Sequence, residues 1–217
     1  MPKVLILVDK VGWSYDSIAR GIVRYNSNPA LLFEIVSLQD GIEAIERRHA
    51  DYDLVFAMGW TLIVAKKPKH NYRELLPFLD RRKLITGIHS HRSWDDYASL
   101  PDSFPAPPVA LVNKLAQVKS INIISRRLYE IFSHAGLKNI CLTENGVDTE
   151  LFKPTRPVNS DRKLPLVVGF SGSTGSPKHD YLKGLSEFIL PLRDIPNVAV
   201  KVLGGRGEQQ VGRAEMP

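Results

Sequence analysis

The 217-residue sequence is poor in cysteine and has no long apolar run. Its one cysteine, Cys141, has no partner with which to form a disulfide within the chain, which suits a reducing compartment. No run of apolar residues approaches the roughly 18 that a membrane-spanning helix needs. The N-terminal run Lys3–Val8 is too short for a signal peptide and is closed by Asp9 and Lys10. We therefore expect a cytoplasmic protein without a transmembrane segment.

Two common catalytic signatures are also missing. The pattern GxxxxGK[ST] does not occur, which argues against a P-loop nucleotidase, and GxSxG does not occur, which argues against an α/β-hydrolase. The segment Phe170–Ser173 only imitates the second pattern. Apolar residues make up 43% of the chain and charged residues 24%, which are ordinary values for a globular protein and exclude intrinsic disorder.

The positive charge is confined to one segment. The chain has a formal net charge of +6, and Lys66–Arg92 holds eight basic residues against Glu74 and Asp80, so the rest of the chain is neutral. This basic segment has three interpretations: a solvated face, a contact with anionic membrane lipids, or a nucleic-acid surface. Because no stacking aromatics or nucleic-acid motifs accompany it, we expect no nucleic-acid partner.

Short apolar segments alternate with helical patterns along the first 150 residues, which predicts an α/β fold with a doubly wound, Rossmann-like parallel sheet. The predicted strands are Lys3–Val8, Leu32–Leu38, Asp53–Met58, Leu84–His89, Ile121–Ser125 and Ile140–Thr143. The predicted helices are Tyr15–Tyr25 (capped by Ser14 or Asp16), Ile42–His49, Tyr72–Leu79, Val109–Val118 and Arg127–Ala135, the last stopped by Gly136.

Ligands of such sheets bind at the carboxyl ends of the strands. The loops predicted to lie there are Asp9–Ser14, Gly59–Thr61, His89–Asp96 and Ser125–Arg127.

The pattern restarts after a proline-containing polar stretch. Residues 1–153 are predicted to form the first domain, 154–165 a linker and 166–217 an incomplete second domain. In the second domain, strands Leu166–Phe170 and Ala199–Leu203 flank a helix over Lys183–Leu192. A single βαβ unit is too short to complete a doubly wound domain.

A glycine-rich loop, Gly169–Ser176, follows the first strand of the second domain. Glycines let a phosphate approach the backbone N–H groups, and the following helix N-terminus favours its charge. Lys178 and Lys183 add positive charge nearby. The alternative is an ordinary strand-to-helix turn.

At the domain boundary, Asn145–Pro154 (NGVDTELFKP) resembles the NGVD-x-x-x-F-x-P signature of family 4 glycosyltransferases with the GT-B fold. The order around it agrees: Ile121–Arg126 resembles the strand and turn upstream, and VVGFSGS, Lys183-Gly184 and VAVKVLGG resemble the opening of the second domain. The resemblance implies sugar transfer from a nucleotide diphosphate sugar to a glycan or lipid-linked acceptor, with retained anomeric configuration, in polysaccharide biosynthesis. It implies no metal and no cofactor besides the donor substrate.

The resemblance also implies roles for individual residues. It places Gly172 and Ser173 against the donor diphosphate and Lys183 beside the leaving phosphate, where it stabilises developing charge. The family's Arg after the loop glycine is replaced here by Ser173-Thr174, so Lys178 or His179 would take its place. Gly12 would face the donor from the first domain. His89 and His91 would face the interdomain cleft as catalytic residues, and the basic segment would lie at the inner face of the membrane.

Two alternatives stay open at this point. The family's paired glutamates belong further along the second domain than Pro217, so we expect a truncated chain, and it could be an inactive fragment that only binds a nucleotide sugar. In the other alternative, His89 and His91, with Asp95 and Asp96, faintly resemble a metal-dependent hydrolase site, although their spacing differs from HxHxDH.

Overall fold

The computed structural model describes residues 1–65, 72–90, 106–153, 165–171, 180–181 and 183–203. The chain divides into two compact units, Met1–Gly146 and Val147–Pro217, called unit 1 and unit 2 below. Each is described by itself.

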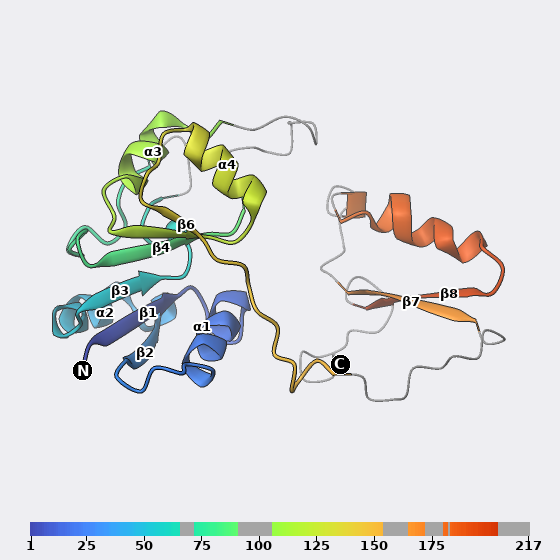
Figure 1. Ribbon diagram of the computed structural model, residues 1–217, viewed down its shortest axis with the longest axis horizontal. Coiled ribbons are helices and arrows are strands. Elements are labelled where there is room, and N and C mark those ends of the chain that lie inside the picture. The colour runs from blue at the N-terminus through green and yellow to red at the C-terminus, as the bar shows by residue number, and fades with distance from the viewer. Residues whose placement is uncertain (66–71, 91–105, 154–164, 172–179, 182, 204–217) are drawn as a thin grey trace. The chain divides into compact units, whose positions relative to one another are not determined.

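Unit 1 is built on a six-stranded parallel sheet (Figure 1). Its strands are β1 (Lys3–Val8), β2 (Leu32–Ser37), β3 (Leu54–Ala57), β4 (Leu84–Ile88), β5 (Ser120–Ile123) and β6 (Ile140–Leu142). They lie in the order β2-β1-β3-β4-β5-β6, and every neighbouring pair is parallel. This confirms the predicted parallel α/β sheet, and the order β2-β1-β3-β4-β5 is one of the two common orders of doubly wound folds, which is consistent with a Rossmann-like sheet.

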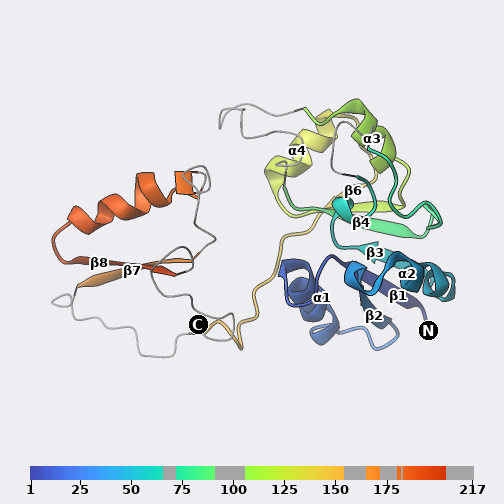
Figure 2. The ribbon, with the colours of Figure 1, turned by 180° about the vertical axis from the view of Figure 1, so that it is seen from behind.

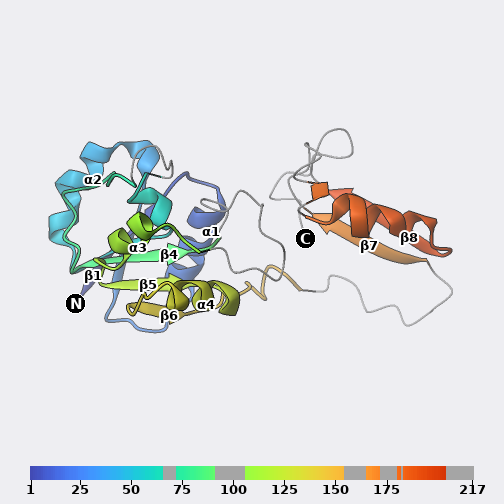
Figure 3. The same ribbon diagram turned by 90° about the horizontal axis from the view of Figure 1, so that it is seen from above.

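The described residues of unit 1 form four α-helices that pack against this sheet. They are α1 (Ser14–Arg24), α2 (Ile42–Arg48), α3 (Val109–Leu115) and α4 (Arg126–His134). The connection from β1 to β2 runs one way across the sheet and that from β2 to β3 runs the other way. Since such crossovers are right-handed, α1 and α2 cover opposite faces (Figures 1 and 2). At the far edge, α4 lies beside β5 and β6 (Figure 3).

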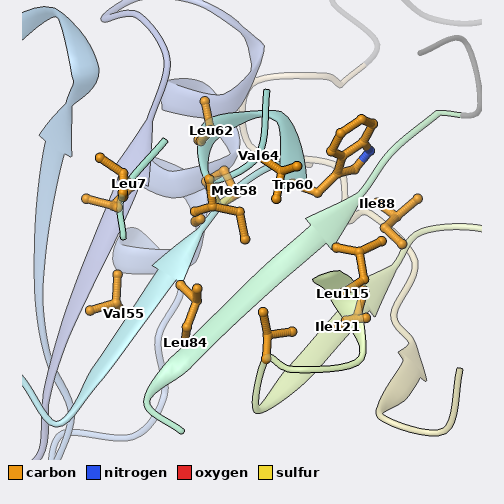
Figure 4. Packing of buried hydrophobic residues seen from close by; sticks show 14 of the residues in the cluster. Leu7, Val55, Met58, Trp60, Leu62, Val64, Leu84, Ile88, Leu115 and Ile121 are labelled. Atoms are coloured by element: carbon orange, nitrogen blue, oxygen red, sulfur yellow. The ribbon is translucent and has the colours of Figure 1, made fainter. Parts of the chain in front are cut away.

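The core explains why the strands are continuously apolar. From Val4 to Val8, every residue of β1 is buried, because helices cover both faces of the central strands. Figure 4 shows the packing between the central strands and the segment after β3, where Met58, Trp60 and Leu62 lie among the buried residues. The described parts of the segment after β3, residues 60–65 and 72–79, thus fill the core without an α-helix.

The predicted helix Tyr72–Leu79 is wrong: the structure has turns there. Pro77 has no N–H to donate within a helix, and Tyr72 has a left-handed φ of 52°. The backbone pairs instead with the segment before it, since the N–H of Ala65 donates to the carbonyl of Arg73 at 2.7 Å.

Helix ends were predicted with mixed success. The start of α1 was predicted to be capped by Ser14 or Asp16, which is wrong, because both lie inside the helix and Trp13 is the N-cap residue. The end of α4 is as predicted: the helix stops before Gly136, whose φ of 91° is the left-handed conformation that glycine adopts easily.

Unit 2 contains one parallel strand pair, β7 (Leu166–Ser171) and β8 (Val198–Leu203). Between them lies the predicted helical segment, but it is irregular: a π-helical turn, Leu185–Ile189, is followed by a 3-10 helix, Leu190–Asp194. Gly184, at φ 68°, sets the start of the turn, and Pro191 supplies no N–H within the 3-10 helix.

Candidate functional site

The candidate site lies where three strands of unit 1 end. The chain leaves β1 toward β2 on one side and leaves β3 toward β4 on the other, so the carboxyl ends of β1 and β3 form a topological switch point. The predicted loops Asp9–Ser14 and Gly59–Thr61 follow these two strands, and His89 follows β4 next to them. The switch point is therefore the first place to look for a ligand.

Tyr15, in the first turn of α1, lies against residues that follow β3 and β4. Its ring centroid lies 5.0 Å from that of His89. Burial raises the pKa of Tyr15, the nearby charge of Asp9 raises it further, and a hydrogen bond with the Thr61 side chain lowers it. Tyr15 therefore stays protonated at neutral pH and forms one cluster with Thr61 and His89.

Two glycines make room for this cluster. A Cβ atom added to Gly59 would lie 2.4 Å from the Tyr15 hydroxyl oxygen. A Cβ added to Gly87 would lie 2.3 Å from the carbonyl oxygen of Met58 and 2.6 Å from Nε2 of His89. Both glycines are buried, so any side chain there would displace the tyrosine or the histidine.

His89 is held in one tautomer. Its Nε2 lies 2.7 Å from the carbonyl oxygen of Met58, and a carbonyl only accepts, so Nε2 carries the proton. Burial lowers the pKa of His89 below 6.5, against the opposing effect of the Met58 hydrogen bond, so the ring is neutral at pH 7. The other nitrogen, Nδ1, is then a hydrogen-bond acceptor, and it has no partner among the residues that the structure describes.

Neighbouring side chains fix the loop after β1 through hydrogen bonds to its backbone. The buried carboxylate of Asp16 accepts from the Gly12 N–H at 2.9 Å and from Nε of Arg20 at 2.9 Å. The buried Ser37, at the end of β2, donates its hydroxyl to the Asp9 carbonyl at 3.2 Å. Gly12 itself has a left-handed φ of 78°, which allows the chain to turn into α1.

The predicted site residues are only partly brought together. Gly12 and His89 both lie at the switch point of unit 1, as their predicted positions at strand ends required. His91, Gly172, Ser173 and Lys178 lie outside the residues that the structure describes, as do Asp95 and Asp96. Lys183 lies in unit 2, exposed, directly before Gly184 and the helical turn that follows β7.

The sequence indicated Asp16 as a possible helix cap and placed Thr61 in a strand-end loop, but it assigned a role in the site to neither of them, nor to Tyr15. Asp16 is positioned four residues after Gly12, which suits a side chain that reaches back from the first helical turn to the loop. Tyr15 gave no such signal, because its role depends on Gly59 and His89, which come from distant parts of the chain.

Half of the eight basic residues of the basic segment are described, and Arg81 and Lys83 among them serve local structure. Glu74 forms an ion pair with Nη2 of Arg81 at 2.6 Å and accepts a hydrogen bond from Nζ of Lys114 on α3 at 3.0 Å. Lys83 donates to the Tyr52 carbonyl at 3.0 Å. Lys66, Lys67, Lys69 and Arg92 lie outside the described residues. The contact with anionic lipids stays a prediction.

Neither a membrane span nor a metal cluster is found in the described parts of the chain. Their helices are too short or too polar to cross a membrane. Their His, Cys, Asp and Glu side chains do not gather in groups of three or more that could hold a metal ion.

Comparisons with known proteins add no relative. A scan against protein-family models finds no match, and a search among curated proteins finds none either.

Proposed function

We propose that this chain is part of a GT-B glycosyltransferase that moves a sugar from a nucleotide diphosphate sugar to a glycan or lipid-linked acceptor. The observation that carries the proposal is the position of the signature-like segment. The two units divide between Gly146 and Val147, inside NGVDTELFKP, and a parallel βαβ-like unit follows it. A Rossmann-like sheet before that segment and a new parallel strand pair after it are what a two-domain transferase requires.

In this proposal, unit 2 binds the donor. The loop after β7, with Gly172, Ser173 and Lys178, takes the diphosphate, and Lys183 stabilises the charge that develops on the leaving phosphate. The helical turn Leu185–Ile189 follows β7 along the chain and precedes the parallel strand β8, so its first N–H groups would add to this positive charge. We propose that the reaction retains configuration and needs no metal.

Unit 1 supplies the other side of the reaction. His89 presents a neutral imidazole with Nδ1 as an acceptor, which suits a hydrogen bond from a sugar hydroxyl better than a bond to a phosphate. The setting we propose is the cytoplasm, with the basic segment at the membrane that carries a lipid-linked acceptor.

The test is binding of UDP, GDP and their sugars to the whole 217-residue chain, measured by isothermal titration calorimetry. We expect one nucleoside diphosphate series to bind. Lys183→Ala should weaken that binding by about tenfold, since it removes one charge contact to phosphate. Lys201→Ala is the matched control, because Lys201 is an exposed lysine on β8, and it should bind as the wild type does.

The outcomes separate the alternatives. If a folded chain binds none of these compounds, the proposal fails. If it binds a nucleotide sugar but never releases the nucleoside diphosphate in the presence of acceptor glycans, the chain is a non-catalytic binding fragment. If Lys183→Ala and Lys201→Ala weaken nucleotide binding equally, Lys183 contributes only to the overall positive charge of unit 2 and makes no specific contact with the phosphate.

A further inference from the structure

The outer edge of β6 is not paired with any strand among the described residues. β6 is the last strand of the sheet of unit 1 (Figure 3). On its inner side, the carbonyl of Asn139 accepts from the N–H of Ile121 at 2.7 Å, and the N–H of Thr143 donates to the carbonyl of Ile123 at 2.8 Å. Successive residues of a strand turn their backbone groups to opposite sides, so the even-numbered residues here turn their N–H and C=O groups away from the sheet.

This edge lacks the features that usually protect an edge strand, namely charges, prolines and bulges. Residues 139–143 contain no charged residue and no proline, their register with β5 has no bulge, and Cys141 is exposed. The other edge strand, β2, differs. It carries Glu34 in its middle, and the N–H of Ser37 already donates to Oδ2 of Asp40 at 3.3 Å. Of the two edges, β6 is therefore the one that is open to pairing.

Side-chain hydrogen bonds fix both ends of this strand. At its start, Nδ2 of Asn139 donates to the carbonyls of Leu115 at 3.1 Å and Val118 at 2.7 Å, at the end of α3 and just beyond it. At its end, the side-chain amide of Asn122 on β5 donates to the hydroxyl of Thr143. The outward backbone groups between these two points are thus held in the extended conformation that a further strand requires.

Residues 138–144, called the edge segment below, have the sequence Lys-Asn-Ile-Cys-Leu-Thr-Glu. This sequence is complementary to itself when a second copy runs antiparallel to it, with the two Cys141 residues opposite each other. Lys138 of each copy then faces Glu144 of the other copy, so both ends of the pairing join opposite charges. Opposite charges on facing residues stabilise antiparallel strands, whereas like charges there destabilise them.

The backbone agrees with this register. Ile140 of one copy lies opposite Leu142 of the other, and both turn their N–H and C=O groups outward, so the two residues can exchange both hydrogen bonds. The two Cys141 residues then form a non-hydrogen-bonded pair, whose Cα atoms lie about 4.5 Å apart. The neighbouring registers that keep the backbone bonds would place Lys138 or Glu144 opposite an apolar residue. Charge and backbone thus favour the same pairing.

We infer that the chain forms a two-fold symmetric dimer through β6, in which the two six-stranded sheets join into one. The partner at this edge is a second copy of the chain, because the edge segment supplies its own complementary charges and apolar side chains. The inference does not depend on the proposed function, since the edge segment contains none of the residues assigned to donor or acceptor.

The first test is analytical ultracentrifugation of the whole 217-residue chain in a reducing buffer. We expect a reversible dimer within the range of about 1 to 100 µM chain. Lys138→Glu should weaken association by about tenfold, because the charge pairs at both ends of the pairing become repulsive. The double variant Lys138→Glu/Glu144→Lys restores opposite charges and should dimerise again. Lys3→Glu is the control, because Lys3 is an exposed lysine on β1, and this variant should dimerise as the wild type does.

The second test is thiol cross-linking. Cys141 is the one cysteine of the chain, so a disulfide must join two chains. Diamide takes one hydrogen from each of two thiols, is reduced to a hydrazine and leaves a disulfide, and the expected separation of the two Cys141 residues is one that a disulfide can span. Cys141 should cross-link about tenfold faster than the control Cys141→Ser/Val109→Cys, since the dimer raises the local concentration of the Cys141 thiol. Val109 is exposed on α3 and not on the edge strand.

Each of three results overturns the inference. The first is a chain that stays monomeric up to about 100 µM. The second is a dimer that Lys138→Glu leaves unchanged, because its interface then lies elsewhere. The third is cross-linking of the Val109→Cys control as fast as that of Cys141. If Lys138→Glu does not fold, Glu144→Lys takes its place, since it sets lysines opposite each other at the same two positions.

Discussion

The two units of the chain differ most in how they bury apolar side chains. Unit 1 has a continuous core with buried residues from β1 to β5 and from all four α-helices. Among the described residues of unit 2, Leu185 is the only buried hydrophobic residue, and Phe188 is 70% exposed. Apolar burial is the dominant favourable term in folding. Unit 1 therefore contains the basis of its own stability, whereas the described part of unit 2 does not.

Separating the units should produce the largest effect. Residues 1–146 expressed alone should unfold cooperatively, at nearly the midpoint of the first transition of the whole chain. Residues 147–217 alone should show no cooperative transition, because a two-stranded sheet is marginal in water. Circular dichroism during heating measures both. A cooperative transition in the 147–217 peptide would show that unit 2 has a core that its described residues do not reveal.

A phenylalanine in each unit gives the next largest contrast. Phe132 of α4 is fully buried, so Phe132→Ala should cost about 3–5 kcal/mol of unfolding free energy through lost burial and a cavity. Phe188→Ala, in the exposed turn of unit 2, should stay within about 0.5 kcal/mol of the wild type. Urea unfolding measures both values. Similar losses in the two variants would contradict the contrast.

The same contrast explains what the sequence could predict. The strands of unit 1 were predicted to within about two residues, because continuous burial on both faces leaves a clear apolar run such as Lys3–Val8. The helix predicted over Tyr72–Leu79 failed, because Leu76 and Leu79 are buried by contacts with the core that do not need a helix. The spacing of apolar residues alone does not show whether they are buried on one face of a helix or by an irregular segment that packs against the core.

The candidate site could also be predicted only in part from the sequence. That Gly12 and His89 lie at strand ends could be predicted, because in parallel sheets the loops after strands share one edge. The cluster around Tyr15 could not, since the approach of Gly59 to its hydroxyl depends on how β1, β3 and α1 pack. The sequence also did not show which polar residue at the start of α1 would bond to the preceding loop. It offered Ser14 and Asp16 equally, and the structure shows that Asp16 accepts from the Gly12 N–H.

Replacing a glycine by alanine should lower the stability at a tightly packed position of unit 1 and not at an open position of unit 2. Gly59→Ala places a Cβ 2.4 Å from the Tyr15 hydroxyl oxygen and should destabilise unit 1 by about 1–3 kcal/mol. Gly169→Ala on β7 of unit 2 has nothing within 4 Å of the new Cβ and should be neutral or slightly stabilising. Urea unfolding of both variants provides the measurement, with the NMR signal of the His89 ring as a readout of the site. If Gly59→Ala leaves the stability and the His89 signal unchanged, Tyr15 does not hold the position described.

The smallest contrast concerns acid sensitivity. Burial raises the pKa of Glu74, but the hydrogen bonds from Lys114 and Arg81 outweigh it, so the net pKa lies below the usual 4.5. A lowered pKa contributes stability that is present above pH 4.5 and is lost as the pH falls through the folded value. Glu74→Gln should therefore lower the stability at pH 7 by up to about 1 kcal/mol and by less at pH 3. Glu150, in unit 2, forms an exposed pair with Lys153 at 3.6 Å, so Glu150→Gln should change the stability at pH 7 by less than about 0.5 kcal/mol. Urea unfolding at the two pH values provides the measurement. An equal loss of unfolding free energy at pH 7 and pH 3 for Glu74→Gln would mean that the side chain acts through packing. The interactions with Arg81 and Lys114 would then contribute nothing measurable to the stability of unit 1.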